Sequence, residues 1–421
     1  MTLNRKPIQV LEAVHRVMEK VRVLPPETVY YLNSGGRVLA EDLTATNDVP
    51  VFTKSAMDGF AVRASDTEGA SGDCRIEFKV VEEVPAGASS DYILKKNEAF
   101  RIMTGAEVPK SADTVVMFEQ SKETEEGFTV RKTFTKGENI AFQGEECLKG
   151  DVIVPEGTLI NPGVTATLAT FGYEYVKVYK KPVVGVLSTG SELLDAGDTL
   201  ERGKIRNSNT PMVLAQLGRM NIEGRHYHLE SDDFNTILKR VREMIEAVDA
   251  VITTGGVSVG DYDLLPKIYE ALGAEVLFNK VAMRPGSVTT VSAYGDTLLF
   301  GLSGNPSACY SGFELFCRPA FLSMMNSRNV YAPFINAVLD ENFTKPNPFT
   351  RFIRAEVKFT EEGLLVKPSG FNKSNAVTSI AKSNGVIVLP GGTRGFKQGD
   401  KVKVMMTDMT SGTDTFRVPD K

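Results

Sequence analysis

The spacing of hydrophobic and polar residues changes several times along the chain, and each change marks a predicted segment. Residues 8–21 carry an apolar side chain every three or four positions, which predicts an amphipathic helix. A strand is predicted at 38–44, and short apolar runs separated by turns at 74–133 predict a small β-rich lobe. After residue 325, short strands and turns return and predict a β-barrel or sandwich.

The segment that begins at residue 181 has the most regular pattern. Its apolar runs lack the alternation of a half-exposed strand, which is typical of a parallel sheet buried on both faces. Helical spacing separates these runs, so we predict a doubly wound α/β domain. Ser208 or Asn209 would cap one helix, and Ser231 to Asp233 would cap another. The predicted strands are 183–187, 225–229, 248–252 and 298–302, and the helices are 208–217, 234–248, one from 264 and one ending at 325.

The fold class is therefore α/β plus β, in several domains. We predict an N-terminal domain made of residues 1–46 and 140–180, with a β-rich lobe of residues 47–139 inserted into it. Residues 181–328 would form the central α/β domain and residues 329–410 the C-terminal β-barrel. The polar residues 411–421 would form a flexible tail.

Three strands of the central domain end in loops of glycine and small hydroxyl residues: STGSE at 188–192, GGVSVGD at 255–261 and SGNPS at 303–307. In a doubly wound sheet such loops lie side by side at the ligand-binding edge. Glycine-rich turns before a helix point backbone N–H groups at an anion, and an acid just beyond can hold a divalent cation. Each loop alone would also fit an ordinary turn, but three together favour a phosphate- or nucleotide-binding crevice.

Candidate polar residues also lie outside these loops. Lys280 and Arg284 are close in sequence and could clamp an oxyanion, although exposed cations are commonly solvated surface. Asp58 belongs to a turn that fits simple hairpin chemistry, and Thr104 follows a strand, where its hydroxyl could face a ligand. The stretches FTRFIR at 349–354 and SNAVTS at 374–379 favour surface loops.

Composition narrows the classes of function. A formal net charge of −5 over 421 residues gives no overall basic footprint for nucleic acid. No apolar run approaches the roughly 20 residues that span a bilayer. The four cysteines form no CxxC pair, and of the three histidines only His226 and His228 are close, on a predicted strand. We therefore expect a cytoplasmic protein without nucleic-acid or membrane partners and without histidine-based catalysis.

Six motifs in one order carry a resemblance to a known family: SAMDGFAV, RIMTGAEVP, STGSEL, GGVSVGDYD, RPG and GLSGNPS. Together they resemble the molybdopterin molybdenumtransferases, the bacterial molybdenum-insertion enzymes that are related to the C-terminal domain of gephyrin. The resemblance extends from about residue 7 to residue 406.

The resemblance implies an activity. Such an enzyme takes adenylylated molybdopterin and molybdate as substrates, releases AMP with Mg²⁺ as cofactor, and yields the molybdenum cofactor. It also implies an elongated homodimer, whose cleft lies between the central domain of one subunit and the N-terminal lobes of the other. The central domain would resemble molybdopterin adenylyltransferase. That enzyme and the proteins that deliver the cofactor to molybdoenzymes are the implied further partners.

The resemblance also assigns residues, position by position. It implies Glu192, Asp232 and Asp263 as metal ligands. The implied catalytic residues are these three with Asp58, Thr104, Lys280 and Arg284. The substrate-binding set is Thr189, Gly190, Ser208, Asn209, Gly255, Gly256, Ser258, Gly260, Pro285, Gly286, Gly304, Asn305, Pro306, Ser307, Arg354, Ser374 and Ser379.

Some positions depart from the pattern of the family. Ser287 and Val288 follow Gly286 where the family often has lysine and proline, so one cation expected near molybdate is absent. Ser303 stands at a usual proline, and Ala141 and Glu146 stand at a usual arginine and aspartate. Two alternatives therefore stay open, a pterin-binding scaffold of the gephyrin type and another nucleotide-phosphate hydrolase built on the same central domain.

A mechanism follows as a hypothesis. The three acids would hold Mg²⁺ on the pyrophosphate link, where it would act as a Lewis acid. Lys280 and Arg284 would stabilise the charge that develops on the leaving phosphate. No protein nucleophile is needed, because molybdate is the incoming oxyanion or activates the attack on phosphorus.

Overall fold

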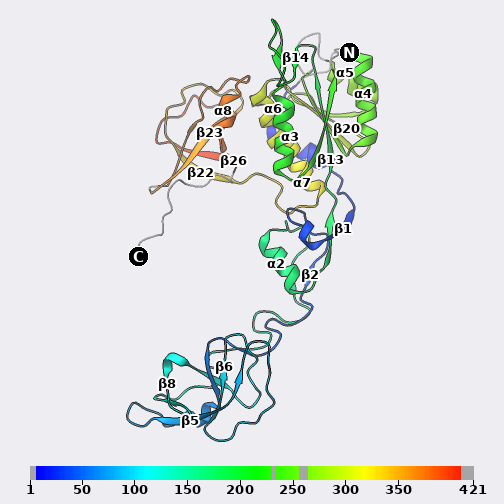
Figure 1. Cartoon of the computed structure of the whole chain (residues 1–421). Helices are drawn as coiled ribbons and strands as arrows, with labels where there is room; N and C mark the ends of the chain where they lie inside the picture. The colour runs from blue at the N-terminus through cyan, green and yellow to red at the C-terminus, as the bar shows by residue number, and fades with distance from the viewer. Residues whose placement is uncertain (1–5, 230–232, 256–263, 362, 409–421) are drawn as a thin grey trace. The chain divides into compact units, whose positions relative to one another are not determined.

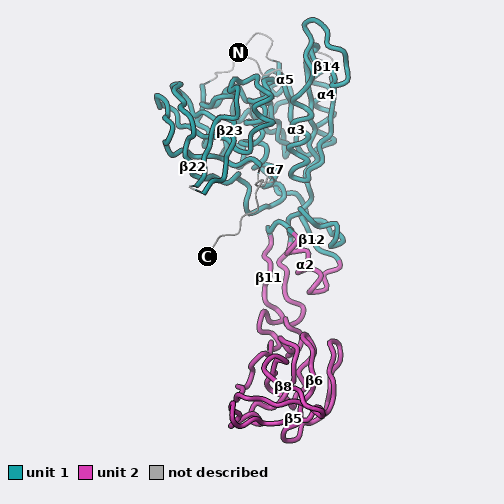
Figure 2. Tube along the Cα trace, turned by 60° about the vertical axis from the view of Figure 1, so that its left-hand side comes forward, with its two compact units in different colours: residues 1–40, 157–161, 175–421 teal, residues 41–156, 162–174 magenta. Residues whose placement is uncertain are grey.

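The computed structural model describes residues 6–229, 233–255, 264–361 and 363–408. The chain divides into two compact units, coloured in Figure 2. Unit 1 comprises residues 1–40, 157–161 and 175–421, and unit 2 comprises residues 41–156 and 162–174. Asp232, Gly256, Ser258, Gly260 and Asp263, all predicted site residues, lie outside the described residues. The five sequence-derived domain boundaries stay a prediction.

Unit 2 is built around a six-stranded sheet in the order β7-β4-β6-β5-β9-β8. Phe60, Phe78 and Phe128 stack in its core, with ring centroids 3.8 Å apart for Phe60 and Phe128. The sheet strands are β4 (Gly59–Val62), β5 (Ile76–Val84), β6 (Glu98–Ile102), β7 (Thr114–Met117), β8 (Ser121–Glu123) and β9 (Gly127–Val130). The unit also contains β2 (Leu43–Thr44), β3 (Lys54–Ser55), β10 (Ile140–Ala141), β11 (Val152–Val154), η2 (Ala64–Thr67), η3 (Phe118–Gln120) and α2 (Pro162–Thr170).

The strand predicted at 38–44 is mostly wrong. Only Leu43 and Thr44 form a strand, which pairs with β11, while Val38 and Leu39 make isolated bridges within unit 1. The apolar side chains in this stretch are buried, so the hydrophobic pattern reflected burial rather than a continuous ladder.

The centre of unit 1 is a six-stranded sheet in the order β16-β13-β17-β21-β20-β18. The first four strands are parallel, which confirms the predicted α/β class, and β20 and β18 are antiparallel additions that the sequence did not reveal. The strands are β13 (Val183–Thr189), β16 (Glu223–Leu229), β17 (Ala250–Thr254), β18 (Glu275–Phe278), β20 (Thr290–Tyr294) and β21 (Thr297–Leu302).

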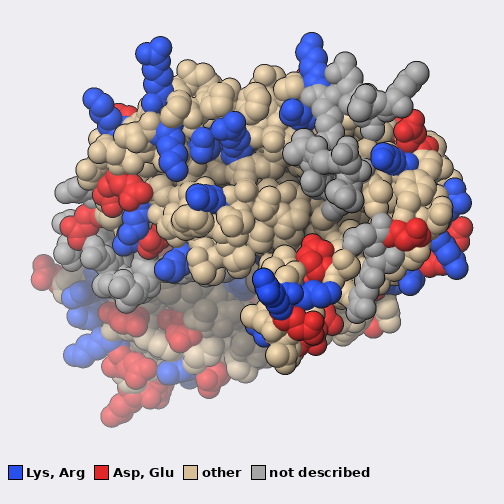
Figure 3. Space-filling view, turned by 90° about the horizontal axis from the view of Figure 1, so that it is seen from above, with Lys and Arg blue, Asp and Glu red and all other residues tan. Residues whose placement is uncertain are grey.

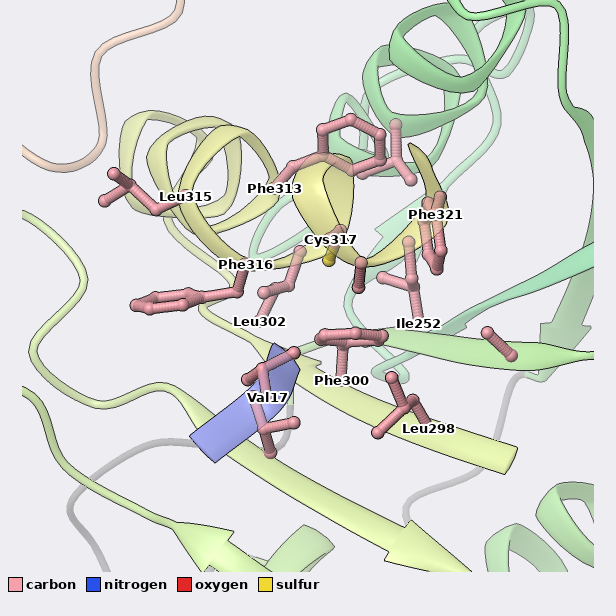
Figure 4. Close-up of a cluster of buried hydrophobic side chains, with 14 of the residues drawn as sticks. Val17, Ile252, Leu298, Phe300, Leu302, Phe313, Leu315, Phe316, Cys317 and Phe321 are labelled. Atoms are coloured by element: carbon pink, nitrogen blue, oxygen red, sulfur yellow. The ribbon is translucent and has the colours of Figure 1, made fainter. Parts of the chain in front are cut away.

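Helices cover both faces of this sheet (Figure 1). One face packs against α1 (Val10–Met18), α3 (Asn209–Arg219) and the continuous run of α6 (Pro306–Gly312), the π-helix η4 (Phe313–Cys317) and α7 (Arg318–Met324). Figure 4 shows the aromatic side chains of that run meeting Ile252 and Phe300 of the sheet. The other face packs against α4 (Phe234–Ala247) and α5 (Leu265–Leu272).

The C-terminal part of unit 1 is a closed five-stranded barrel, as predicted. It runs β23-β24-β22-β26-β25 and closes because β23 pairs with both β24 and β25. The strands are β22 (Phe334–Leu339), β23 (Thr350–Thr360), β24 (Gly363–Pro368), β25 (Gly385–Leu389) and β26 (Lys401–Met406). The other elements of unit 1 are β1 (Pro26–Tyr30) paired with β12 (Tyr175–Tyr179), η1 (Tyr31–Asn33), β14 (Leu193–Leu194), β15 (Ile205–Arg206), β19 (Met283–Arg284) and α8 (Thr378–Ala381).

Within the described ranges, no helix is long and apolar enough to cross a membrane. The four cysteine thiols are all free.

A buried acid joins the central sheet region to the barrel. The Glu314 side chain, in the π-helix, has no exposed surface and accepts hydrogen bonds from Arg219 and, at 2.7 Å, from Gln216. Arg219 also donates to the carbonyl of Thr407, just beyond β26, at 2.6 Å. A buried carboxylate needs such a partner, because an unpaired charge inside a protein is strongly destabilising.

We therefore predict that Arg219→Ala lowers the free energy of unfolding by about 3 kcal/mol, because Glu314 would keep its burial and lose its cation. Calorimetry should show a clearly lower Tm. The matched control is Arg240→Ala on α4, whose partner Glu243 is exposed, and there the loss should stay below about 1 kcal/mol. Equal Tm values for the two variants would contradict the prediction.

Candidate functional site

The described residues of the three predicted loops, which for the second loop are Gly255 alone, lie at one edge of the central sheet. Strands β13, β17 and β21 are adjacent and parallel, so their carboxyl ends lie side by side. Gly255 adopts a φ of 93°, and a Cβ there would come within 3.0 Å of the Thr189 carbonyl oxygen. A Cβ on Gly304 would lie 3.5 Å from the Cα of Gly255. The chain thus brings Thr189, Gly255 and Gly304 together, and Gly255 is the one that must lack a side chain.

The amino end of α3 closes this edge. Asn209 is 7% exposed and its side-chain amide donates to the Gly304 carbonyl at 2.9 Å, which joins α3 to the third loop. Ser208 occupies the cap position, as predicted, but its side chain makes no hydrogen bond to the helix. Asn207 serves instead: it accepts from the Thr210 backbone N–H at 3.1 Å and donates to the Ser188 hydroxyl at 3.1 Å.

Asn207 is therefore a residue that the sequence reasoning missed. The available signal was the asparagine three positions before Thr210, which is the spacing of a capping side chain and its N–H partner. Its second bond fixes the hydroxyl of a fully buried serine at the end of β13. Asn207 thus positions the first loop against the start of α3.

The predicted acids are represented among the described residues by Glu192, whose side chain is exposed. It lies against Gly190, where a Cβ would meet the carboxylate Oε2 at 2.4 Å and where φ is 144°. Only glycine lets the carboxylate fold back over this turn. Within the ranges that the structure describes, no three His, Cys, Asp or Glu side chains gather in a way that could hold a metal.

A cationic pocket of about 480 Å³ lies between the central region and the barrel within unit 1. Arg284 lines it from β19, which pairs with the start of β23. Pro285, Gly286, Asn305 and Ser374 also line it, so the structure brings these predicted residues together. Lys280 is half-buried and lies outside the lining of this pocket.

Ser307 fastens the third loop to the barrel. Its hydroxyl donates to the Ala376 carbonyl at 2.6 Å and its backbone N–H donates to the Ser374 carbonyl at 3.0 Å. The preceding Pro306 begins α6 with Asn305 as the residue before it. The Ser307 hydroxyl therefore joins the two parts of unit 1.

The stretch 349–354 was expected to be a surface loop, and that prediction is wrong. Residues 350–354 belong to β23, and Arg354 is 1% exposed. Its Nε donates to the Ser379 hydroxyl at 3.0 Å, and its Nη2 donates to Asn372 Oδ1 at 3.3 Å. Burial lowers the pKa of Arg354 to about 10. The prediction failed because a charged residue such as arginine suggests an exposed position, whereas Arg354 is buried in a barrel strand.

Asp58 and Thr104 form a pair within unit 2. Asp58 Oδ1 accepts from the Thr104 backbone N–H at 2.6 Å and from its hydroxyl at 2.8 Å. These bonds favour the ionised carboxylate, so they lower the pKa of Asp58, with the backbone bond as the larger cause. Both side chains are exposed, and Gly59 must be glycine because a Cβ would meet the Val116 carbonyl at 2.0 Å.

The central sheet, its loops and the cationic pocket define an α/β protein with a site whose charge suits anionic ligands. Comparison with known families names the class: residues 8–172 match the MoeA N-terminal region (domain I and II), residues 185–323 the probable molybdopterin binding domain, and residues 336–406 the MoeA C-terminal region (domain IV).

Full-length relatives agree. The chain is 54% identical over 405 residues to molybdopterin molybdenumtransferase of Staphylococcus aureus strain MRSA252, covering 96% of this chain and 97% of the relative. It is 51% identical over 408 residues to that of Staphylococcus epidermidis strain ATCC 12228, covering 97% of each. The crystal structure of the molybdopterin biosynthesis moeA protein from Pyrococcus horikoshii OT3 superposes with a TM-score of 0.83 at 29% identity, over 96% of this chain and 100% of that one. The chain belongs to the molybdopterin molybdenumtransferase family, which confirms the resemblance found in its sequence.

The Asp58–Thr104 pair yields a prediction about pKa. Thr104→Val removes the hydroxyl donor and keeps the backbone N–H, so the pKa of Asp58 should rise only part of the way towards its ordinary value of 3.8. Because the folded pKa is depressed, the stabilising effect of the pair is present above the ordinary pKa and is lost as pH falls through the folded pKa. Carboxyl NMR titration measures the shift.

Asp233 is the internal reference in that titration, because it accepts equivalent bonds from Thr236 on α4 and should not change in Thr104→Val. An unchanged pKa of Asp58 in the variant would show that the hydroxyl bond does not stabilise the carboxylate.

Proposed function

We propose that this chain is a molybdenum-inserting transferase of molybdenum cofactor biosynthesis. It would take adenylylated molybdopterin and molybdate, release AMP and yield molybdenum-bound molybdopterin. The observation that carries the proposal is the shared edge of the central sheet, where Thr189, Gly255 and Gly304 come together and where the third loop also lines a pocket of cations. Phosphate and oxyanion substrates need these two features, backbone N–H donors and positive charge.

The crevice loops would hold the phosphates of the adenylylated pterin. Gly255 permits close approach of the backbone, and Thr189 and Asn305 lie in the flanking loops. Lys280 and Arg284 would stabilise the negative charge that develops on the leaving phosphate. Asp58 and Thr104, in unit 2, would contribute the remaining catalytic pair of the proposal.

Magnesium is proposed as the cofactor, with Glu192, Asp232 and Asp263 as its ligands. The donor chemistry fits, because carboxylate oxygens are the ligands that Mg²⁺ prefers. Glu192 presents an exposed carboxylate at the first loop, and the glycine beneath it leaves the space that a Cβ would fill. When bound, Mg²⁺ would supply Lewis-acid polarisation of the pyrophosphate link.

The protein itself need form no covalent intermediate. Arg284, Ser374 and Asn305 line the pocket in which we place molybdate as the incoming oxyanion. Arg354 would act indirectly, since its guanidinium is buried and hydrogen-bonds the residues that precede Ser374. Its proposed role is to hold that loop in position.

The family supports the transferase over the scaffold and hydrolase alternatives, because the full-length relatives carry the transferase name. We further propose that the chain works in the cytoplasm as a homodimer. Molybdopterin adenylyltransferase and proteins that deliver the finished cofactor are its proposed partners.

The proposal is tested by chromatographic measurement of AMP release from adenylylated molybdopterin with molybdate and Mg²⁺, each omitted in turn. Release should require all three. Binding of the adenylylated pterin without release would instead favour a carrier, and release that is independent of molybdate would favour a hydrolase.

Two substitutions separate the proposed roles. Lys280→Ala should lower kcat for AMP release by about 100-fold, as expected when a donor to developing charge is lost. Glu192→Gln should raise the Mg²⁺ concentration needed for half-maximal rate, on the order of 10-fold, because a neutral amide replaces a charged ligand. Lys382→Gln, an exposed residue outside the pocket lining, is the control and should retain wild-type values. Wild-type Mg²⁺ dependence in Glu192→Gln would remove Glu192 from the metal site.

A further inference from the structure

The cationic pocket is unusual in its charge balance. Arg284, Lys345, Arg351 and Lys373 line it, and its lining contains no aspartate or glutamate. None of these four side chains forms an ion pair with a carboxylate in the part of the chain that the structure describes. Figure 3, a view from above, shows several lysine and arginine side chains in blue on a mostly uncharged part of the surface. A bound anion would be attracted by these four cationic side chains, because no carboxylate in the lining neutralises them.

Arg351 is fixed in place before any ligand arrives. Its Nε donates to Asn347 Oδ1 at 2.6 Å, and its guanidinium carbon lies 5.5 Å from the centre of the Phe343 ring. Asn347 is itself 1% exposed and bonded to Thr393. A guanidinium held in this way loses little conformational freedom when it binds a ligand.

Arg284 and Arg351 are neighbours on paired strands. They occupy the same register position of β19 and β23, whose backbones hydrogen-bond in parallel. Burial first, and the proximity of Arg284 second, lower the pKa of Arg351. Two like charges side by side repel each other in the empty pocket, so an anion placed between them gains from both.

The fourth cation sits on a loop that is also held. Lys373 lies over the Phe371 ring at 5.4 Å, and its carbonyl accepts from the buried Arg354 at 3.4 Å. Lys345 lines the pocket from the segment that precedes β23 and is exposed. The barrel thus contributes three of the four cations.

We propose that Arg351, together with Lys345 and Lys373, makes this pocket selective for a tetrahedral dianion over a monoanion of the same shape. The inference rests on the proposed function in one respect, that molybdate is the oxyanion the pocket receives. It goes further in assigning the selectivity to three barrel residues to which the sequence analysis gave no role in a site. Neighbouring cations without a carboxylate partner attract a dianion more strongly than a monoanion, whereas shape alone would not distinguish the two ions.

The test measures anion affinity directly, with no pterin present. Equilibrium dialysis with elemental analysis would compare molybdate and tungstate, both dianions, with perrhenate, a tetrahedral monoanion of similar size. Wild-type protein should bind molybdate at least about 10-fold more tightly than perrhenate. Arg351→Gln should weaken molybdate binding by about 10-fold, in line with loss of a charge-assisted hydrogen bond, and should change perrhenate binding less.

Further variants separate charge from folding. Arg351→Lys keeps the positive charge but loses the hydrogen bond from the guanidinium to Asn347, so it should retain more molybdate affinity than Arg351→Gln. Lys373→Gln should also weaken binding, and Lys382→Gln, outside the pocket, should not. Ser287→Lys places a cation in the same lining, so in the Arg351→Gln background it should restore part of the affinity.

Equal affinity of the wild-type protein for molybdate and perrhenate would overturn the inference. The inference would also be overturned if Arg351→Lys lost as much molybdate affinity as Arg351→Gln, because Arg351 would then have a structural role. If the wild-type protein prefers dianions but shows no molybdate-dependent AMP release, the proposed function fails and this inference stands. If AMP release requires molybdate but the KM for molybdate is unchanged in Arg351→Gln and Lys373→Gln, the inference fails and the proposed function stands.

Discussion

The parallel pairing of β13, β17 and β21 is the constraint on which the site depends. These three strands are hydrogen-bonded neighbours in one direction, so the chain leaves the sheet three times at the same edge. Thr189, Gly255 and Gly304 follow these strands and approach one another closely, and Gly255 allows this because a Cβ there would lie 3.0 Å from the Thr189 carbonyl oxygen. The geometry of the crevice is thus determined by main-chain atoms, which suits a ligand recognised through backbone N–H groups.

A second constraint joins this edge to the barrel. Within unit 1 three polar connections are found among the described residues: β19 pairs with β23, Ser307 bonds to the carbonyls of Ser374 and Ala376, and Arg219 links the buried Glu314 to Thr407. All three are backbone or buried polar contacts, which are costly to break without replacement. The pocket between the two parts is therefore formed before a ligand binds, and Arg351 is held in position by Asn347 and Phe343.

The sequence predicted the parts of the structure that repeat a simple pattern. The parallel core, its helices and the closed barrel followed from hydrophobic spacing, and the three loops followed from glycine after an apolar run. It missed β18 and β20, which flank a segment whose charged residues are the cations Lys280 and Arg284, and it took the start of β23 for a loop. Arg354 explains the second error, because its burial depends on Ser379 and on the loop at 371–373, contacts that only the folded chain creates.

The cationic pocket shows why net charge is a poor guide to local chemistry. The chain carries −5 overall, yet four cations meet where the lining has no acid. At physiological ionic strength the Debye length is about 8 Å, so most of the acidic surface is screened from a ligand in the pocket, while Arg284 and Arg351 act at contact. These residues are 67 positions apart in sequence (351 − 284) and become neighbours through the β19–β23 pairing. Selection for a dianion would then depend on that one short parallel ladder, and the acidic character of the rest of the chain would have little effect on it.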